Sequence, residues 1–438
     1  MRHRAWLWLV LSSLAGSLLF GATRPHYGGT LNVDVSTSFS SLEASELPPI
    51  LSRLIGETLV RFNSRGEPEP LLATSWQREN DGKRWRIALR PKVSFHDGDA
   101  LSAGNAAPVL LESLKKTYPD VTVSAGGQTL LIQSDVPLPD LLTDLASART
   151  AIVRKNDAGL PIGTGPFRVT AWEPGRRLAL AAFEPYWGGR PFLDSIVVAA
   201  GSSRATTDLF DIPFASPRRA IPETVKLWQS APVDLLALVA TDLHPSIYQA
   251  LALVIDRTPI VNVLAQRRAE AAYGLLPQWM GGYEFLFQIA PDLARARQVL
   301  SQLAPSPLAL SYPPNDSFAR AVAERIALNA RDVGLILQPT SNPNGTLRLI
   351  RSRLESTNAA AELARLARLL GANTGSSPLD TAKPETLFAA EHELLENNRV
   401  IPLLRLPIVY GLAPRVHSRE HGPAAPLILR LEDFWIDP

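Results

Sequence analysis

The chain has 438 residues, 37 of them proline and none cysteine, and a formal net charge of +2. Because one hydrophobic core seldom organises more than about 300 residues, this length predicts at least two lobes. The lack of cysteine excludes disulfides, thiolate metal sites and cysteine nucleophiles. Arg2 and Arg4 account for the excess charge. The balanced remainder gives no electrostatic reason to expect nucleic acid as a partner.

A basic start followed by an apolar run opens the sequence. Residues 5–22 carry no charge and follow two arginines. This order is typical of a secretory signal, so we predict a signal segment over residues 1–22 and a periplasmic location. Phe20 stands where cleavage after Ala22 would require a small residue. An uncleaved signal that tethers the protein to the membrane is therefore the alternative.

The first half of the chain reads as short strands, hairpins and helices. In residues 84–90, Trp85, Ile87 and Leu89 alternate with polar or small residues, as on a strand with one buried face. Turn signals at Asp81-Gly82 and Pro174-Gly175 predict two antiparallel hairpins. We also expect strands near 30–34 and 129–133 and helices over 51–59 and 103–116.

From residue 247 onward, helical patterns alternate with strands. A continuous apolar run at 235–240 precedes this region and suits a buried strand. Strands mixed with helices favour α/β lobes. We expect helices over 247–264, 292–303, 317–333 and 358–370, strands at 335–338 and 401–409, and a loop over 374–384.

Two short motifs could suggest chemistry, but their context argues against it. In Phe95-His96-Asp97-Gly98, adjacent side chains in a turn point apart and no nucleophile completes a site, so we expect His96 to bond local backbone. Gly163-Thr-Gly-Pro166 lacks the lysine and helix of a phosphate loop. The histidines show no metal-ligand spacing. We therefore expect no enzyme activity, no cofactor and no metal.

Three blocks of residues occur in a specific order along the chain. The first contains Glu57-Thr-Leu-Val60, Pro70-Leu-Leu-Ala-Thr-Ser-Trp76, Trp85-Arg-Ile-Ala-Leu-Arg90, Val93-Ser-Phe-His-Asp-Gly98 and Leu101-Ser-Ala-Gly-Asn105. The second contains Gly163-Thr-Gly-Pro-Phe-Arg-Val169 and Tyr186-Trp-Gly-Gly-Arg-Pro191, and the third Ala250-Leu-Ala-Leu-Val-Ile-Asp-Arg257 and Val400-Ile-Pro-Leu403. In these blocks the chain resembles family 5 of the bacterial extracellular solute-binding proteins, which serve importers of dipeptides, oligopeptides and nickel.

The resemblance implies the two-lobed α/β fold of periplasmic binding proteins, type II and similar to cluster C. Two crossing strands, near 235–240 and 401–404, would form a hinge about which the lobes close on a ligand. The first lobe would comprise residues 23–232, completed by 405–438, and a shortened second lobe residues 233–404.

The resemblance also implies a function. The chain would be the substrate-binding component of an ABC importer, a monomer that captures peptides or peptide-like solutes and delivers them to a permease complex in the inner membrane. The alternative is a degenerate binding module that acts as a periplasmic receptor or scaffold without a transporter.

The sequence departs from the family in the second lobe. The stretch before the 401–409 strand is short and rich in Ala and Leu, and it lacks the Asp that pairs with a peptide amine in relatives. Candidate ligand-binding residues are therefore assigned by position: Ser45, Glu46, Phe214, Tyr273, Trp279 and Arg405. If Arg405 faces the cleft, it favours a ligand carboxylate; the alternative is a surface position. For each aromatic candidate the alternative is ordinary core packing. Glu46 is the alternative partner for a ligand amine.

Overall fold

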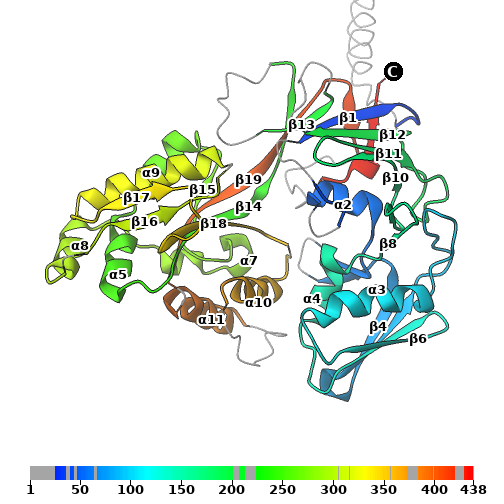
Figure 1. Cartoon of the computed structure of the whole chain (residues 1–438), viewed down its shortest axis with the longest axis horizontal. Coiled ribbons are helices and arrows are strands. Elements are labelled where there is room, and N and C mark those ends of the chain that lie inside the picture. The colour runs from blue at the N-terminus through cyan, green and yellow to red at the C-terminus, as the bar shows by residue number, and fades with distance from the viewer. Residues whose placement is uncertain are drawn as a thin grey trace, which may run out of the picture.

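The structure, a computed structural model, shows two lobes joined by two long strands (Figure 1). It describes residues 25–35, 40–43, 47–63, 67–200, 207–212, 223–303, 305–314, 316–355, 357–371, 383–397, 399–419 and 429–437. The predicted signal segment, residues 1–22, lies outside the described residues. Strands and helices mix in both lobes, as the sequence predicts.

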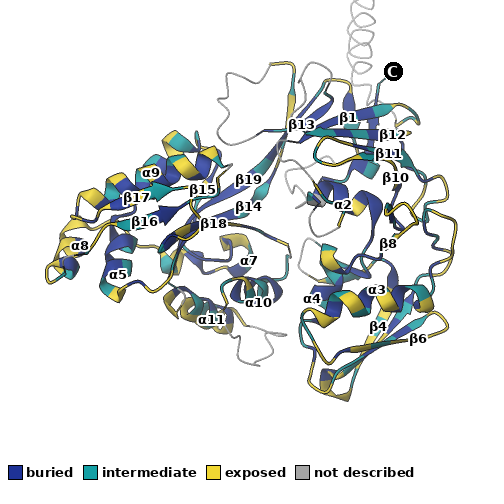
Figure 2. Ribbon diagram, viewed as in Figure 1, coloured by how far each residue is buried: buried dark blue, intermediate teal, exposed yellow. Residues whose placement is uncertain are grey.

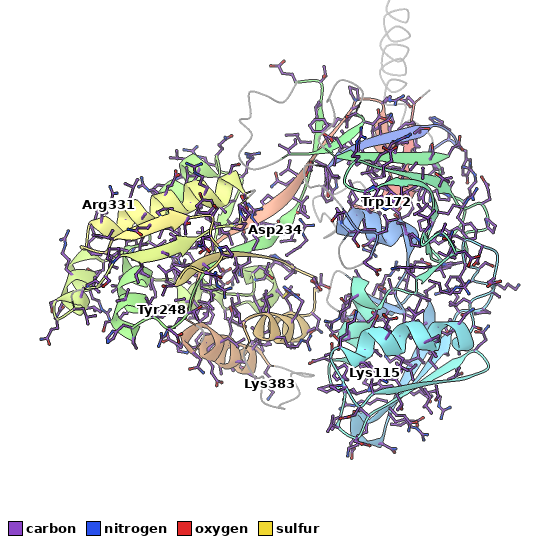
Figure 3. The ribbon with its side chains drawn as sticks, in the orientation of Figure 1. Lys115, Trp172, Asp234, Tyr248, Arg331 and Lys383 are labelled. Atoms are coloured by element: carbon purple, nitrogen blue, oxygen red, sulfur yellow. The ribbon has the colours of Figure 1, made fainter. Side chains whose placement is uncertain are left out.

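The two connecting strands are β14 (Lys226–Ala240) and β19 (Val400–Leu412), which pair in antiparallel fashion. One carries the chain into the second lobe and the other carries it back, and Asp234, labelled in Figure 3, lies at the crossing. Both strands are longer than the predicted runs. The pairing is irregular around Pro232, which allows β14 to continue through a residue that lacks a backbone N–H.

The first lobe contains part of an 11-stranded sheet and a separate four-stranded sheet. Its elements are β1 (Thr30–Val35), α2 (Pro49–Ile55), β2 (Val60–Phe62), β3 (Pro68–Pro70), β4 (Ala73–Glu79), β5 (Arg84–Leu89), α3 (Ala103–Lys115), β6 (Thr122–Gly126), β7 (Thr129–Gln133), α4 (Leu141–Ala146), β8 (Arg154–Lys155), β9 (Pro161–Ile162), β10 (Phe167–Glu173), β11 (Arg177–Ala182), β12 (Ser195–Ala200), β13 (Leu209–Asp211), β20 (Val416–Ser418) and β21 (Phe434–Ile436). The large sheet has the order β10-β11-β12-β1-β13-β19 here, and the smaller one the order β4-β5-β7-β6.

The smaller sheet packs against α3. Trp85, Ile87 and Leu89 are buried, as their alternation in the sequence predicts. The helix begins after Ser102, whose hydroxyl accepts from the Asn105 backbone N–H while the Asn105 side chain accepts from the Ser102 N–H. This reciprocal capping satisfies two N–H groups that the first turn leaves without helical partners. The 101–105 part of the first sequence block is therefore a helix start.

The second lobe continues the large sheet and covers it with helices on both faces (Figure 2). Its elements are α5 (Pro245–Val254), α6 (Arg257–Pro259), β15 (Glu270–Ala271), α7 (Gln278–Gly281), α8 (Leu293–Leu300), β16 (Leu308–Ser311), α9 (Ser317–Arg331), β17 (Leu337–Thr340), β18 (Leu347–Arg353), α10 (Ala359–Leu369) and α11 (Pro384–Asn397). Strands follow the order β19-β14-β18-β16-β17 here, and β15 pairs with β19.

The apolar run in β14 is explained by burial on both faces of the sheet. Leu236 and Leu238 belong to the core beneath α5, α8 and α9. Leu235, Ala237 and Val239 belong to a second core beneath α10 and α11. Since side chains alternate between faces along a strand, a strand covered on both sides has no polar face.

The helix expected over 247–264 is broken. α5 ends at Val254, and α6 begins after Asp256, whose carboxylate accepts from the Thr258 backbone N–H at 2.9 Å. Within the described ranges, no single helix is long and apolar enough to cross a membrane. Helix α5 and residues 257–264 reach the length and apolar composition of a membrane span only when they are taken together, and they are bent by 53° relative to each other.

Candidate functional site

A small cavity, with about 10 Å³ of free volume and so room for about one water molecule, lies where the connecting strands enter the second lobe. Its walls come from the middle of β14, from segment 275–277, from the end of β18, from α10 and from β19. The lining residues are Pro232, Val233, Leu235, Leu275, Pro277, Ser352, Leu354, Glu362, Leu366 and Arg405. The cavity has a mainly apolar lining with a few polar groups, and it is too small to enclose a peptide-sized solute.

Arg405 lies in this lining and is 3% exposed, so the alternative of a surface position for it is wrong. Its guanidinium donates to the Glu284 carboxylate and, at 2.6 Å, to the Gly274 carbonyl oxygen. The guanidinium thus already has an anionic partner inside the protein.

Glu284 links Arg405 to the segment that carries two of the predicted site residues. Its carboxylate accepts from the backbone N–H of Tyr273 at 3.0 Å and from that of Gln278 at 3.0 Å. Trp279 follows directly in α7. The Arg405–Glu284 pair therefore positions Tyr273 and Trp279 through the backbone of segment 273–279.

Tyr273 and Trp279 differ in their surroundings. The Tyr273 ring lies beneath the Arg257 guanidinium, with 4.6 Å from the Arg257 Cζ to the ring centroid. Arg257 also donates to the Pro402 carbonyl at 2.6 Å, and burial lowers its pKa to about 10. Trp279 is 48% exposed and offers a free aromatic surface. A contact between either ring and a ligand stays a prediction.

Glu391 of α11 is a second buried carboxylate in this region and was not predicted from the sequence. It is 0% exposed and accepts from the Leu275 and Leu276 N–H groups and from the Tyr283 hydroxyl at 2.8 Å. Burial raises its pKa to about 7, although these hydrogen bonds and the charge of Arg405 oppose the shift.

Ser45, Glu46 and Phe214 lie outside the described residues, so their assignment to the site stays a prediction. The carboxylates at Glu284, Glu362 and Glu391 escaped the sequence analysis. Glu362 and Glu391 could have been found in the sequence, because each interrupts the apolar stripe of a helix. Glu391, for example, stands four positions from the buried Leu387 and from the buried Leu395.

The first two sequence blocks meet at Glu57 in the first lobe. Its carboxylate accepts from the Thr164 hydroxyl at 2.9 Å, the Tyr186 hydroxyl at 2.8 Å and the Trp187 indole N–H at 2.8 Å. Burial raises the pKa of Glu57, and the three hydrogen bonds oppose the shift. This hub joins α2, the 163–166 turn and the 186–191 turn, so the blocks form an internal framework.

The His96 side chain bonds to backbone groups, as expected, but the prediction of a local partner is wrong, because both partners lie in the distant 163–166 turn. Its Nδ1 accepts from the Gly163 N–H at 3.3 Å, which leaves Nε2–H to donate to the Gly165 carbonyl at 3.0 Å. Burial lowers the His96 pKa to about 4, which is consistent with this neutral tautomer. Among the described residues, no group of three or more side chains gathers that could hold a metal ion.

Comparisons with known proteins agree with these features. The sequence profile of the bacterial extracellular solute-binding proteins, family 5 (middle region), matches residues 67–210. The nickel-binding protein NikA of Staphylococcus aureus is 30% identical over 192 residues, which cover 41% of this chain and 39% of NikA. The glutathione-binding protein GsiB of Pectobacterium atrosepticum is 28% identical over 318 residues, 62% of this chain and 60% of GsiB. The chain thus spans less than two thirds of both relatives.

A solved structure shares the fold. The periplasmic binding protein DppA of Helicobacter pylori, in complex with the peptide STSA, superposes with a TM-score of 0.75 at 16% identity, over 94% of this chain and 99% of that one. The two-lobed periplasmic-binding-protein fold expected from the sequence is confirmed. In its sequence blocks and its architecture the chain is similar to the family 5 bacterial extracellular solute-binding proteins, and the profile match covers residues 67–210.

Proposed function

We propose that the chain is the substrate-binding component of an ABC importer, capturing peptides or peptide-like solutes in the periplasm for a permease complex in the inner membrane. The observation that carries the proposal is the hinge formed by β14 and β19, which pair with each other where the chain passes between the lobes. Two paired strands allow the lobes to rotate toward each other and enclose a solute. We expect the permease complex to recognise the closed form of the protein.

Closure around a solute requires binding energy and no catalytic group. A solute that binds the closed form about 10⁴-fold more tightly than the open form shifts a 1:99 population to 99:1. The polar groups of the cavity are bonded within the protein: the Glu362 carboxylate accepts from Arg365, and the Ser352 hydroxyl accepts from Arg365 at 2.8 Å. This arrangement supports a binding role over a catalytic one.

The proposed contacts come from both lobes. In the second lobe, the exposed ring of Trp279 and the half-buried ring of Tyr273 supply apolar walls. In the first lobe, Ser45 and Glu46 supply polar contacts by their position after β1, and Phe214 follows β13. Since the Arg405 guanidinium already pairs with Glu284, its first role is to fix segment 273–279, and a ligand carboxylate would have to share it.

Native mass spectrometry of protein purified from a bacterial periplasm tests the proposal. We expect a co-purified solute of a few hundred daltons, released on denaturation. Calorimetry with short peptides that have free or acetylated N-termini then tests the amine-binding role of Glu46. A preference for the free amine that Glu46→Gln abolishes supports that role. A protein that carries no solute and binds none of the peptides argues for the receptor or scaffold instead.

A further inference from the structure

The two ends of helix α10 both touch the first lobe. Just before the helix, the Thr357 hydroxyl donates to the backbone carbonyl oxygen of Asn63 at 2.6 Å. In its last turn, the Arg368 guanidinium lies 3.6 Å from the Asp140 carboxylate and 3.8 Å from that of Asp144. Figure 1 shows α10 and α4 as neighbours across the two lobes. One helix of the second lobe is thus tied to the first lobe at two points.

On the first-lobe side of this contact, Arg368 meets two carboxylates, Asp140 and Asp144. Asp144 is 0% exposed, and its carboxylate accepts from the Tyr118 hydroxyl at 2.6 Å and pairs with the Arg149 guanidinium. Asp140 keeps a partly exposed side chain. Asp140 and Asp144 thus place two carboxylates at the start of α4, and Arg368 from the second lobe faces both of them.

On its other side α10 is fixed to the second lobe. Leu363 and Leu366 belong to the core that includes the inner face of β14. The Asn358 side chain caps the helix by accepting from the Ala361 N–H at 3.0 Å. The helix therefore moves with the second lobe. Because β14 and β19 form the hinge, rotation of the lobes apart would carry Arg368 and Thr357 away from their partners.

We propose that α10 is a closure clasp, which holds the lobes together directly and lets the solute-free protein populate the closed form. An ion pair of this exposure changes an equilibrium constant about two- to fivefold. Since the contact is partly exposed, its effect weakens as ionic strength rises. The inference goes beyond the proposed function because it concerns the protein without solute and does not depend on which solute is bound.

Distance measurements between spin labels test the clasp. The chain has no cysteine, so Lys115→Cys in α3 and Lys383→Cys beside α11, both exposed and one in each lobe (Figure 3), accept labels uniquely. Protein unfolded and refolded to remove any carried solute is measured by pulsed dipolar spectroscopy. We expect mainly the short distance of the closed form in low salt, and a smaller closed fraction in 0.5 M salt.

Variants separate the clasp from a general effect of charge. We expect Arg368→Ala to lower the closed-to-open ratio about two- to fivefold and Asp140→Asn to lower it less, since Asp144 still faces Arg368. The double variant should lower the ratio no further than Arg368→Ala alone. Arg331→Ala, which removes an exposed arginine from the far end of α9 (Figure 3), should leave the ratio unchanged.

Two results would overturn the clasp. One is a solute-free protein that is mainly in the open form. The other is a distance distribution that is the same in Arg368→Ala as in the Arg331→Ala control. Either result can occur in a protein that still binds peptides, so the proposed function would stand. Conversely, a protein that binds no solute can still show the clasp.

Discussion

The Arg405 guanidinium and the Glu284 carboxylate form an ion pair in which both side chains are nearly excluded from water, 4% and 10% exposed. Arg405 lies on the strand that returns from the second lobe, whereas Glu284 follows α7, 121 positions earlier. Breaking a buried pair by removing one partner leaves the other charge without compensation in a poorly solvated place. The pair therefore makes the position of segment 273–279 dependent on β19.

Arg405→Met should lower the free energy of unfolding by about 3 kcal/mol, because Glu284 would keep a buried charge with fewer donors. Urea denaturation followed by circular dichroism measures this change. The matched control is Arg331→Met on exposed α9, for which we expect a change within about 0.5 kcal/mol. Equal stability of the two variants would contradict the structural role of the pair.

Gly165→Val should prevent stable folding, costing about 3 kcal/mol or more. The backbone conformation alone does not exclude a side chain here, because Gly165 does not have a positive φ. Instead, a Cβ at this position would lie 2.4 Å from the Leu54 carbonyl oxygen. Gly126→Ala, where a Cβ meets open space, is the control. A melting temperature for Gly165→Val equal to that of the control would refute this explanation.

Glu391 should make stability fall as the pH rises. Burial raises its folded pKa to about 7, above its ordinary 4.5, so between these values the folded protein holds a proton that the unfolded chain releases. The stabilisation is complete below about pH 4.5 and is lost as the pH rises through 7. Denaturation experiments at pH 5 and pH 8 measure this change. Between these pH values the free energy of unfolding should fall by roughly 2–3 kcal/mol more in the native protein than in Glu391→Gln. Parallel losses in both proteins would contradict the assignment.

The opposite sign is expected for His96, so the native-minus-variant comparison is needed. Burial lowers the folded pKa of His96 to about 4, below its ordinary 6.5. Its contribution is therefore present above about pH 6.5 and is lost as the pH falls toward 4. Since His96 is unchanged in Glu391→Gln, its effect cancels in the difference between the two proteins.

Glu57 should support folding of the first lobe without affecting solute affinity. Glu57→Ala leaves three donors without their acceptor and should cost about 3 kcal/mol or more, whereas Trp187→Phe removes one donor and should cost about 1 kcal/mol. Trp279→Phe, at an exposed tryptophan, should stay within about 0.5 kcal/mol. Denaturation gives the stabilities and calorimetry the affinities. A Trp187→Phe variant of native stability but lost binding would show that the hub faces the solute.

Local sequence patterns predicted those parts of the fold in which turn residues and alternating apolar residues occur together. Both hairpins appear as β4–β5 and β10–β11, since turn residues separate alternating runs there. α11 was missed because one of its three buried positions is a glutamate, which weakens the apolar stripe. The first part of β14 was missed because it contains Pro232 and Asp234, and only its irregular pairing with β19 keeps it a strand.

The candidate site was less predictable, since its contacts join residues that are far apart in the sequence. Arg405 could be named by its position after a crossing strand, but its burial depends on Glu284, and no local pattern connects the two. Arg368 and Asp140 likewise come together only through the arrangement of the lobes. The lobe boundaries at 232 and 404 stay predictions, because β14 and β19 run continuously across both.

The order of strands in the first lobe has a consequence for synthesis. β13 pairs with β1 on one side and with β19 on the other, and the core around Leu31 also includes Leu431, Phe434 and Ile436. A ribosome therefore releases the first lobe without its closing strands until nearly the whole chain has emerged. The first lobe therefore cannot complete its core before the second lobe has been synthesised, so its folding awaits the last strands of the chain.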